Sequence, residues 1–389
     1  MIPLSRPVIT EDMIEAAINA LRNEKLVMGE SVFKFEEAFA KYIGVKYAIS
    51  LNSGTSALIA AFHAIKLSNK DYVIAPSATF ISTISSAMLL GAKPLFAEID
   101  LDTYTIDVNH LSELLKECKE VKAIVPVHLY GYPAEMETIM EEAEKRGVYV
   151  IEDAAQAHGA EYHGKKVGTM GHIGIFSFYS IKNMTVGGDG GMLVTNNEEI
   201  VESVRKLRDC GRRSKYVHDI LGYVFRLNTV NAAIGLVQLK YLDKWNKRRR
   251  GIATLYDKLL SDLDQVKTPP KPSSNIKPVY HLYVIRLPSE ETRNTLGAWL
   301  REQGVQTLIH YPVPVHLQPA IMKYTEYKEG TLPKTELWAK TVLSLPIFPE
   351  LKDEEVKYIC EKIHEFFNKE IHNKKEWIER GKKWIQKLM

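Results

Sequence analysis

Residues 176–183 read FSFYSIKN and residues 187–191 read GGDGG, so Lys182 lies just before a glycine-rich loop. Asp153 stands upstream of it, after an apolar run. A lysine amine condenses with the aldehyde of pyridoxal 5'-phosphate (PLP), and a carboxylate beside the pyridine nitrogen keeps that ring protonated as an electron sink. Either residue alone is more often a solvated side chain or a helix cap. The pair therefore indicates PLP chemistry only if the chain also provides a phosphate site.

A candidate phosphate site is NSGTSAL at residues 52–58, between an apolar run at 47–51 and a helical pattern at 57–65. Backbone N–H groups at the start of such a helix favour a phosphate. The alternative is an ordinary helix cap, in which Ser53 or Thr55 accepts a backbone hydrogen bond. The sequence contains neither a Walker pattern nor a dinucleotide fingerprint, so it gives no support to a nucleoside triphosphate or nicotinamide site.

The length and composition predict an ordinary soluble globular protein. Its 389 residues are 45% hydrophobic and 25% charged, which is enough for a large core divided over two or three domains. A formal net charge of +3 with dispersed Lys and Arg does not predict nucleic-acid binding. Cys118, Cys210 and Cys360 lack metal-ligand spacing and are expected to be free thiols in a reducing compartment. Neither a signal peptide nor an apolar span of membrane length is visible, so the cytoplasm is the expected location and no integral membrane segment is expected.

Short apolar runs alternate with helical patterns through the first half of the chain. This alternation predicts an α/β fold with a mainly parallel sheet that is covered by helices on both faces. Ligands of such sheets bind at the carboxyl ends of the strands, where Gly54 and Asp153 would then lie. The expected strands cover 72–75, 94–99, 123–129 and 148–151, and the expected helices cover 81–90, 111–118 and 136–146.

The second half of the chain predicts a smaller α+β domain. A helical stretch from 229 to 262 is expected to break near 248–251, and Pro269-Pro270-Lys271-Pro272 predicts a loop. Beyond it we expect a strand at 281–287, a helix at 293–303 and a strand at 305–309. The predicted domains are a large PLP-binding domain at 1–250, a small domain at 251–369 and a basic amphipathic helix at 370–389.

The last residues of the chain form an amphipathic pattern with lysines around it. Such a helix either touches an anionic membrane or packs on the small domain or on a partner subunit, and packing is the favoured interpretation. The apolar face comprises Trp377, Ile378, Trp384, Ile385 and Leu388.

Taken together, these stretches resemble the DegT/DnrJ family of PLP-dependent aminotransferases, which mostly act on nucleotide-linked keto-sugars. The resemblance runs through nearly the whole chain. It implies fold type I, a homodimer with active sites at the subunit interface, and an amino group donated by L-glutamate. The matching stretches are FEEAFAKYIGVKYAISLNSGTSAL (35–58), APSATF (75–80), VPVHLYGYPAEM (125–136), IEDAAQAHGA (151–160), FSFYSIKN with GGDGG (176–191), IHYPVPVH (309–316) and LSLPIFP (343–349).

The same resemblance implies roles for individual residues. Lys182 would bind the cofactor aldehyde as a Schiff base and transfer protons, and Asp153 would bind the pyridinium nitrogen. Gln156 would approach the phenolic oxygen of the ring, and Phe80 would stack on its face. His158 is either a cofactor contact or a hydrogen-bonded core histidine.

The cofactor phosphate would be bound by the Gly54 and Thr55 amides and by the Ser177 hydroxyl. The sequence departs from the family at Val224, where members usually carry an Asn that reaches the phosphate from the neighbouring subunit. Valine cannot donate that hydrogen bond. Basic residues of the preceding loop are candidates to replace it, namely Arg212, Arg213 and Lys215.

For the substrate, the resemblance points to Arg226, His310, Tyr311 and His316. No metal site is expected, because His310 and His316 straddle two prolines without a carboxylate or Cys companion. An aminotransferase acting on a cyclitol or another cyclic ketone is the nearest alternative. A regulatory relative is disfavoured by the intact Lys182 and Asp153, and a sugar dehydratase of the family would carry His in place of Lys182.

Overall fold

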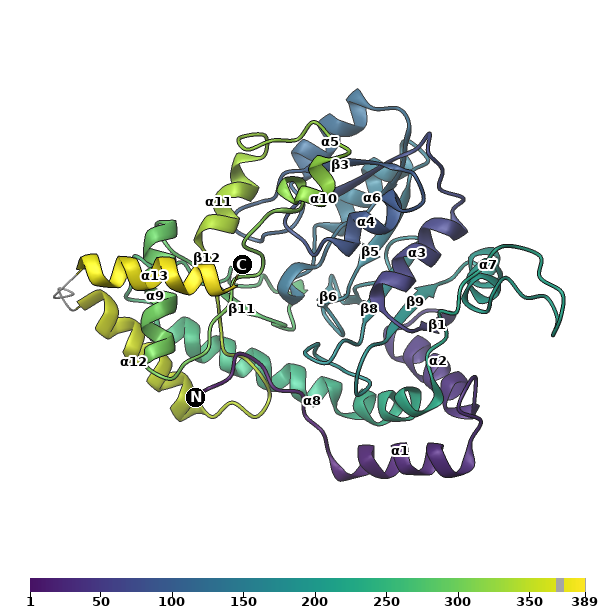
Figure 1. Cartoon of the computed structure of the whole chain (residues 1–389), viewed down its shortest axis with the longest axis horizontal. Helices are drawn as coiled ribbons and strands as arrows, with labels where there is room; N and C mark the ends of the chain where they lie inside the picture. The colour runs from purple at the N-terminus through teal and green to yellow at the C-terminus, as the bar shows by residue number, and fades with distance from the viewer. Residues whose placement is uncertain (369–373, 389) are drawn as a thin grey trace.

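The structure is a computed structural model that describes residues 1–368 and 374–388. The protein has a larger and a smaller part, and a mainly parallel sheet forms the centre of the larger one (Figure 1). In these residues the sheet has seven strands in the order β1-β9-β8-β5-β4-β2-β3. β9 runs antiparallel to both neighbours, and the other pairings are parallel. The predicted fold class is therefore confirmed. The strands are β1 (Tyr47–Leu51), β2 (Tyr72–Pro76), β3 (Lys93–Ala97), β4 (Val121–Ile124), β5 (Tyr149–Asp153), β8 (Ile173–Ser177) and β9 (Gly191–Thr195).

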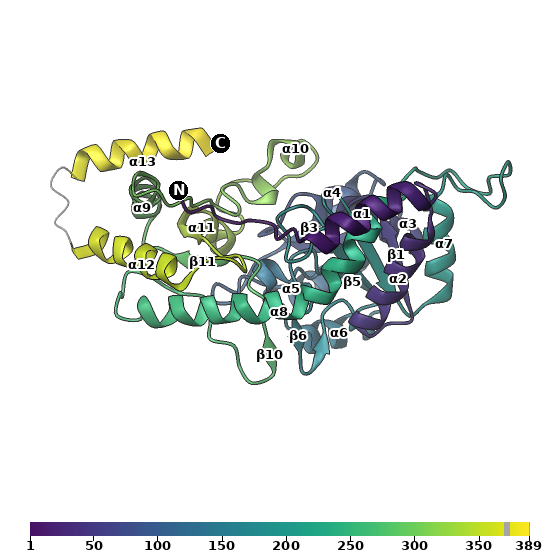
Figure 2. The ribbon, with the colours of Figure 1, turned by 90° about the horizontal axis from the view of Figure 1, so that it is seen from below.

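Helices cover both faces of the sheet, which explains why its strands are almost continuously apolar (Figure 2). One face packs against α3 (Gly54–Ala64), α4 (Ser82–Met88) and α7 (Glu198–Arg208). The other face packs against α2 (Glu30–Ile43), α5 (Val108–Glu117), α6 (Met136–Glu144) and the first half of α8 (Thr229–Leu259). α1 (Glu11–Asn23) lies against α8.

The second part of the protein is built on a two-stranded antiparallel sheet of β11 (Tyr283–Arg286) and β12 (Val342–Leu345). Its core also contains the second half of α8, including Ile252 and Tyr256. The remaining elements are α9 (Glu290–Glu302), α11 (Pro333–Thr341), α12 (Asp353–Asn368), α13 (Lys374–Leu388), the short helices η1 (Leu129–Gly131), η2 (Val315–Leu317) and α10 (Pro319–Met322), and the small strands β6 (Glu161–Tyr162), β7 (Lys165–Lys166) and β10 (Ile276–Lys277).

The predicted break in the helix near residues 248–251 is wrong, because α8 continues through this segment without interruption. Gly251 costs a helix only about 1 kcal/mol relative to Ala, and packing against two cores outweighs that cost. Two arginines of the segment also bind backbone carbonyl groups of the second part. Arg248 donates to the carbonyl of Leu351, and Arg249 donates to the carbonyl of Ile347 at 2.9 Å.

Residues 305–309 do not form the predicted strand. Val305 makes an isolated bridge to Ile2, and Leu308 makes another to Ser344, so the segment never pairs with one strand for long enough to form a ladder. The amide of Ile2 also donates to the carbonyl of Gly304 at 2.7 Å. The first residues of the chain are therefore attached to the second part, a contact that the predicted large domain of 1–250 did not include.

The terminal helix α13 packs on α9, above the second part (Figure 2). Trp384 is buried against Gly297, where a Cβ atom would lie 2.6 Å from the indole ring. Trp377 meets Trp299 edge to face, with the ring centres 5.1 Å apart. Residues 370–373 and 389 of the predicted tail lie outside the described residues. Among those described, none of the helices combines the length and the apolar character needed to cross a membrane.

Replacing Trp384 with Ala should reduce the free energy of unfolding by about 3 kcal/mol, because it removes a buried indole and leaves a cavity over Gly297. Chemical denaturation of the two proteins measures this loss. Lys383→Ala, one residue earlier on the exposed side of α13, is the matched control and should change stability little. Equal stability of the Trp384 variant and wild type would contradict the packing of α13 on α9.

Candidate active site

The carboxyl ends of four strands bring the predicted cofactor residues to one edge of the sheet. β5 ends at Asp153 and β8 ends at Ser177. β1 runs in the same direction as β8, since both are antiparallel to β9, and leads into the start of α3 at Gly54. β2 leads into the segment that carries Phe80. Residues far apart in the sequence therefore meet at the edge where open α/β sheets bind ligands.

Lys182 follows β8 in a loop that is held by backbone hydrogen bonds. Its amide donates to the carbonyl of Tyr179 at 2.8 Å, and the amide of Phe178 donates to the carbonyl of Gly190 at 2.8 Å. Burial of the amine lowers the pKa of Lys182 to about 8, and the Asp153 carboxylate partly opposes this shift. The unprotonated share of the amine at neutral pH is thus far larger than that of an ordinary lysine, as a nucleophile and a base require.

The Asp153 carboxylate is buried and held in one orientation. The Thr83 hydroxyl donates to one carboxylate oxygen at 2.8 Å, and the Ala155 amide donates to the other at 3.1 Å. Thr83 is itself bonded to the Thr79 hydroxyl at 2.8 Å. This arrangement suits a fixed anionic partner for a ring nitrogen, because little reorganisation is needed on binding.

The start of α3 combines a helix cap with two backbone amides that have no partner among the described residues. Ser53 is the N-cap, and its side chain accepts from the Ser56 amide at 3.0 Å, so the capping alternative is correct for Ser53. Among the described residues, no partner bonds the amides of Gly54 and Thr55, which leaves both donors free. A Cβ atom on Gly54 would lie 3.0 Å from the Cβ of Ser177. Glycine therefore allows the helix start to approach the Ser177 hydroxyl closely.

Gln156, Tyr311 and Phe80 lie together beside this edge. The amide nitrogen of the Gln156 side chain donates to the Tyr311 hydroxyl at 3.3 Å, and its oxygen accepts from the Tyr130 amide at 2.7 Å. The Phe80 ring is 53% exposed and lies 5.9 Å from the Tyr311 ring, measured between centroids. Burial raises the pKa of Tyr311, and the Asp153 charge adds to that shift. Tyr311 is therefore a neutral hydroxyl near the cofactor residues.

Of the two predicted histidines in the 309–316 loop, the structure brings only His310 to the site. Burial lowers the pKa of His310 to about 4, with a further contribution from the charge of Lys182, and its Nδ1 lies 2.9 Å from the Ser344 hydroxyl. His316 is fully buried. Its ring nitrogens are bonded to Ser77 at 2.7 Å and Glu336 at 3.3 Å. Both ring nitrogens of His316 thus have partners within the protein, and its predicted contact with the substrate stays a prediction.

Arg226 lies at the base of the segment 209–226, which extends beyond α7 (Figure 1). Its guanidinium group is paired with Asp209 of the same chain. The adjacent Phe225 carbonyl accepts from the Asn52 amide at 2.8 Å. The segment thus runs beside the residues that lead into α3, and no hydrogen bond or ion pair joins Arg226 to Lys182 among the described residues.

Two further histidines, His158 and His281, lie near Lys182. The sequence left two roles open for His158 and predicted no role for His281. His158 is buried between the rings of Phe176 and Phe178, and neither ring nitrogen has a hydrogen-bond partner among the described residues. Burial lowers its pKa to about 3, with a smaller contribution from the Lys182 charge. His281 was predicted only as the first residue of a strand, and no sequence pattern connects it with Lys182. Within the described part of the chain, no group of three or more His, Cys, Asp or Glu side chains is arranged to hold a metal ion.

The profile of the DegT/DnrJ/EryC1/StrS aminotransferase family matches residues 7–364. The chain belongs to this family. It is 43% identical to the "Pleiotropic regulatory protein" of Geobacillus stearothermophilus, over 89% of this chain and 92% of that protein. It is 37% identical to the dTDP-3-amino-3,4,6-trideoxy-alpha-D-glucose transaminase of Streptomyces venezuelae, over 90% and 91% of the two chains. The crystal structure of S. venezuelae DesV superposes with a TM-score of 0.88 at 36% identity, covering 92% of this chain and 94% of that one.

As a member of this aminotransferase family, the protein is a PLP-dependent enzyme, and the described residues fit the cofactor. The unpaired amides of Gly54 and Thr55 suit its phosphate, and the fixed Asp153 carboxylate suits its ring nitrogen. The lowered pKa of Lys182 suits the covalent bond to its aldehyde. When bound, PLP supplies an electron sink for bonds at the amine-bearing carbon of the substrate.

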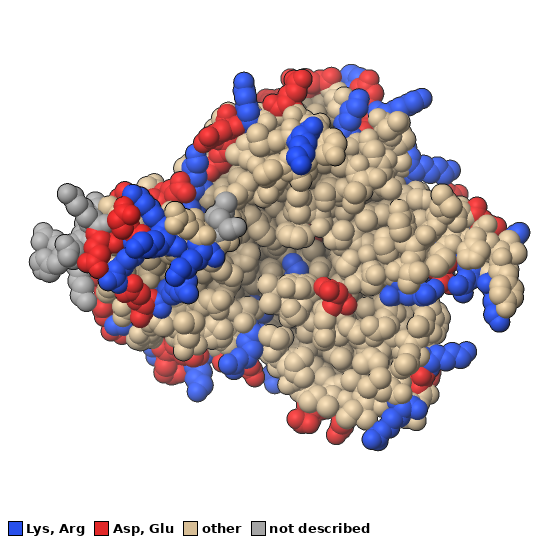
Figure 3. Space-filling view, viewed as in Figure 1, with Lys and Arg blue, Asp and Glu red and all other residues tan. Residues whose placement is uncertain are grey.

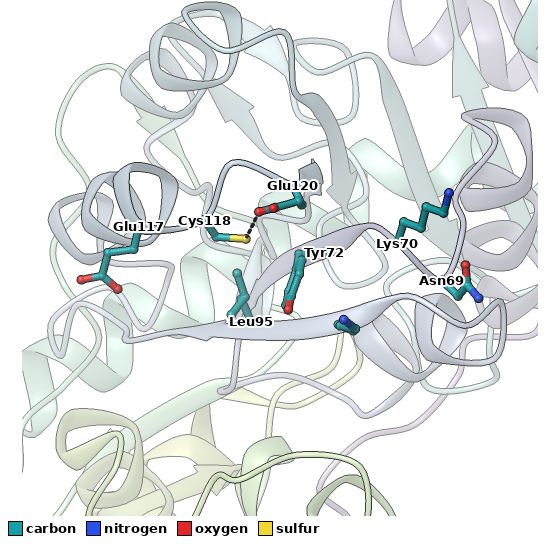
Figure 4. Close-up of a pocket in the computed structure, with 8 residues that line it drawn as sticks. Asn69, Lys70, Tyr72, Leu95, Glu117, Cys118 and Glu120 are labelled. Atoms are coloured by element: carbon teal, nitrogen blue, oxygen red, sulfur yellow. Dashed lines mark hydrogen bonds between the residues drawn. The ribbon is translucent and has the colours of Figure 1, made fainter.

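A surface hollow of about 680 Å³ lies at the other edge of the sheet (Figure 4). It is found where β2, β3 and β4 begin, away from Lys182 and Asp153. Figure 4 shows Cys118 pointing toward Glu120, with 3.6 Å between sulfur and oxygen. Open α/β sheets bind their ligands at the carboxyl ends of the strands, so we do not expect the aminotransferase reaction to take place in this hollow. The lining residues are Asn69, Lys70, Tyr72, Lys93, Leu95, Glu117, Cys118 and Glu120.

The low pKa of Lys182 can be measured on the PLP-free protein by competitive acetylation with acetic anhydride across a pH series. We expect the labelling of Lys182 to have its midpoint at about pH 8. An added lysine peptide with an ordinary pKa of about 10.4 is the internal standard. Asp153→Asn removes a negative charge that favours the ammonium form, so its midpoint should move to lower pH. A midpoint that stays the same or rises in this variant would contradict the interaction between the two residues.

Proposed function

We propose that this aminotransferase transfers an amino group from L-glutamate to the ketone of a nucleotide-linked sugar. The proposal rests chiefly on the low-pKa amine of Lys182 and the fixed Asp153 carboxylate, whose charge acts on that amine, at the carboxyl edge of the sheet. The S. venezuelae relative, a dTDP-sugar transaminase by its name, aligns over 90% of this chain and supports the substrate class.

Lys182 acts as the proton carrier in this proposal. Its Nζ atom would remove a proton from the amine-bearing carbon of the substrate and deliver a proton to the carbon on the other side of the nitrogen. A pKa of about 8 allows the amine both to accept and to donate a proton near neutral pH. Asp153 keeps the ring nitrogen of the cofactor protonated. Gln156, three residues after Asp153, and the Tyr311 hydroxyl, from the second part of the protein, would orient the ring. Because the amino group is stored between two half-reactions, the kinetics should be ping-pong.

Substrate recognition is assigned to residues around the mouth of the site. His310 is uncharged and Tyr311 carries a neutral hydroxyl, so both suit hydrogen bonds to a sugar. Arg226 would bind the diphosphate, since a guanidinium group matches phosphate geometry. Phe80, which is half exposed, would stack on the cofactor ring.

We further propose a homodimer with its active sites at the subunit interface. α1 leaves Ile14, Ile18 and Leu21 exposed at helical spacing, and Leu221 in the 209–226 segment is 94% exposed. Figure 3 shows that the face around α1 and α3 is mostly uncharged, whereas many charged side chains gather around α13. A second copy of the chain would bury this uncharged face.

The function is tested by incubating the purified protein with PLP, glutamate and a panel of nucleotide-linked keto-sugars, followed by mass measurement of the products. Addition of one amino group to a keto-sugar with release of 2-oxoglutarate is the expected result. Amination of a cyclitol ketone instead would replace the proposed substrate class. Borohydride reduction and peptide mapping should place the pyridoxyl group on Lys182, and a label on another lysine would overturn its assignment.

Asp153→Asn should reduce the rate of each half-reaction by on the order of a hundredfold or more, because an amide cannot hold the ring-nitrogen proton. Stopped-flow measurement of the reaction with glutamate provides the rate. Asp264→Asn, an exposed change of the same type, should leave it unchanged. Rates near wild type for Asp153→Asn would remove this carboxylate from the mechanism.

Val224→Asn tests whether the family's missing phosphate donor can be restored. Val224 is 59% exposed, and its carbonyl accepts from the Asn52 side chain at 3.3 Å. If this side chain faces a neighbouring subunit's PLP phosphate, Asn should tighten PLP binding by about 1.5 to 3 kcal/mol at most. Titration of the PLP-free proteins measures the change, with Val217→Asn in the same segment as control. Unchanged or weaker binding would mean that another residue already replaces the missing donor or that the donor is not needed.

A further inference from the structure

His281 is buried at the junction of the two parts of the protein, next to the residue that follows Lys182. It precedes β11 and is 4% exposed. Its Nδ1 atom lies 3.2 Å from Oδ1 of Asn183. Asn183 is itself buried, so its side chain is available only to neighbours within the protein.

Two backbone carbonyls fix the direction of this hydrogen bond. Nδ2 of Asn246 donates to the carbonyl of His158 at 2.7 Å, and a carbonyl can only accept. Oδ1 of Asn246 is therefore the acceptor for Nδ2 of Asn183, at 2.9 Å. The same Nδ2 donates to the carbonyl of Val279 at 3.0 Å. Oδ1 of Asn183 is left as an acceptor, so Nδ1 of His281 must carry the proton.

The surroundings keep His281 uncharged. Burial holds its pKa well below the ordinary value, and the positive charges of Lys182 and Arg249 lower it further. A neutral imidazole has one proton, and Asn183 uses it. Nε2 therefore carries a lone pair, and no described residue donates a hydrogen bond to it.

Asn183 connects this fixed ring to the lysine. It is the next residue after Lys182, and its side chain is bonded to α8 through Asn246 and to the start of the second part through Val279 and His281. We propose that His281 is a positioning residue for Lys182, which acts by donating its Nδ1 proton to Asn183 and thereby fixing the turn that carries the amine. This inference rests on the role of Lys182 in the proposed function.

Two substitutions of His281, by Asn and by Gln, distinguish the proposed role of its Nδ1 atom from any role of its Nε2 atom. An Asn side chain places its N–H group near the position of Nδ1, whereas a Gln side chain places it near Nε2. His281→Asn should therefore retain most of the half-reaction rate, and His281→Gln and His281→Ala should lower it on the order of tenfold to a hundredfold. The KM for glutamate should change little. His364→Ala, a histidine bonded to a carbonyl away from the site, is the matched control.

A second measurement does not depend on activity. In the PLP-free protein, loss of the ring admits water beside the amine, so the acetylation midpoint of Lys182 should rise from about pH 8 in His281→Ala and return in His281→Asn. Asn183→Ala should reproduce the shift. Because the two residues act through one hydrogen bond, the double variant should be no worse than the more affected single variant.

Additive effects of His281→Ala and Asn183→Ala, or a better rescue by Gln than by Asn, would overturn the proposal. So would a wild-type midpoint and rate in His281→Ala. If His281→Ala fails to fold, the Asn and Gln variants and Asn183→Ala still decide the outcome. These results are separate from the proposed function, because a pyridoxyl label on another lysine would refute the role of Lys182 whatever His281 does.

Discussion

The buried Glu152 carboxylate holds together the strand end on which the active site depends. It is fully enclosed and accepts hydrogen bonds of 2.6 to 2.7 Å from three amides in the loop 168–171. His128 adds a fourth bond at 3.0 Å. A buried charge is costly unless its bonding positions are filled, and here they are. Because successive side chains of a strand point to opposite faces, fixing Glu152 also directs Asp153 toward the cofactor site.

Buried hydrogen bonds also attach the 309–316 loop and α11 to the large sheet. His316 joins the 309–316 loop to Ser77 at the end of β2 and to Glu336 in α11. Glu98, after β3, accepts from the Lys334 and Thr335 amides at 2.9 Å each. The second part of the protein therefore meets the large sheet through buried polar bonds rather than through apolar contact alone. Tyr311 is held over the site as a result, and its hydroxyl can reach Gln156.

The sequence predicted the parallel sheet and placed Gly54 and Asp153 at its carboxyl edge, because these features depend on local apolar runs and on residues that follow strands directly. The sequence-based prediction failed for features that are determined by contacts between residues far apart in the chain. The α8 helix continues past Gly251 because two cores hold it, and local glycine and arginine signals do not report those cores. His281 meets Asn183 across 98 positions of the chain, and no periodic pattern marks such a contact.

The unbroken α8 also limits how this enzyme opens. A single rod runs through both hydrophobic cores, with Leu242 in one and Ile252 in the other. Swinging the two parts apart would bend this rod and break its backbone hydrogen bonds, and the Arg249 guanidinium on the Ile347 carbonyl would have to detach. Access to the site therefore depends on movement of the loops at the carboxyl edge of the sheet, rather than on separation of the two parts of the protein.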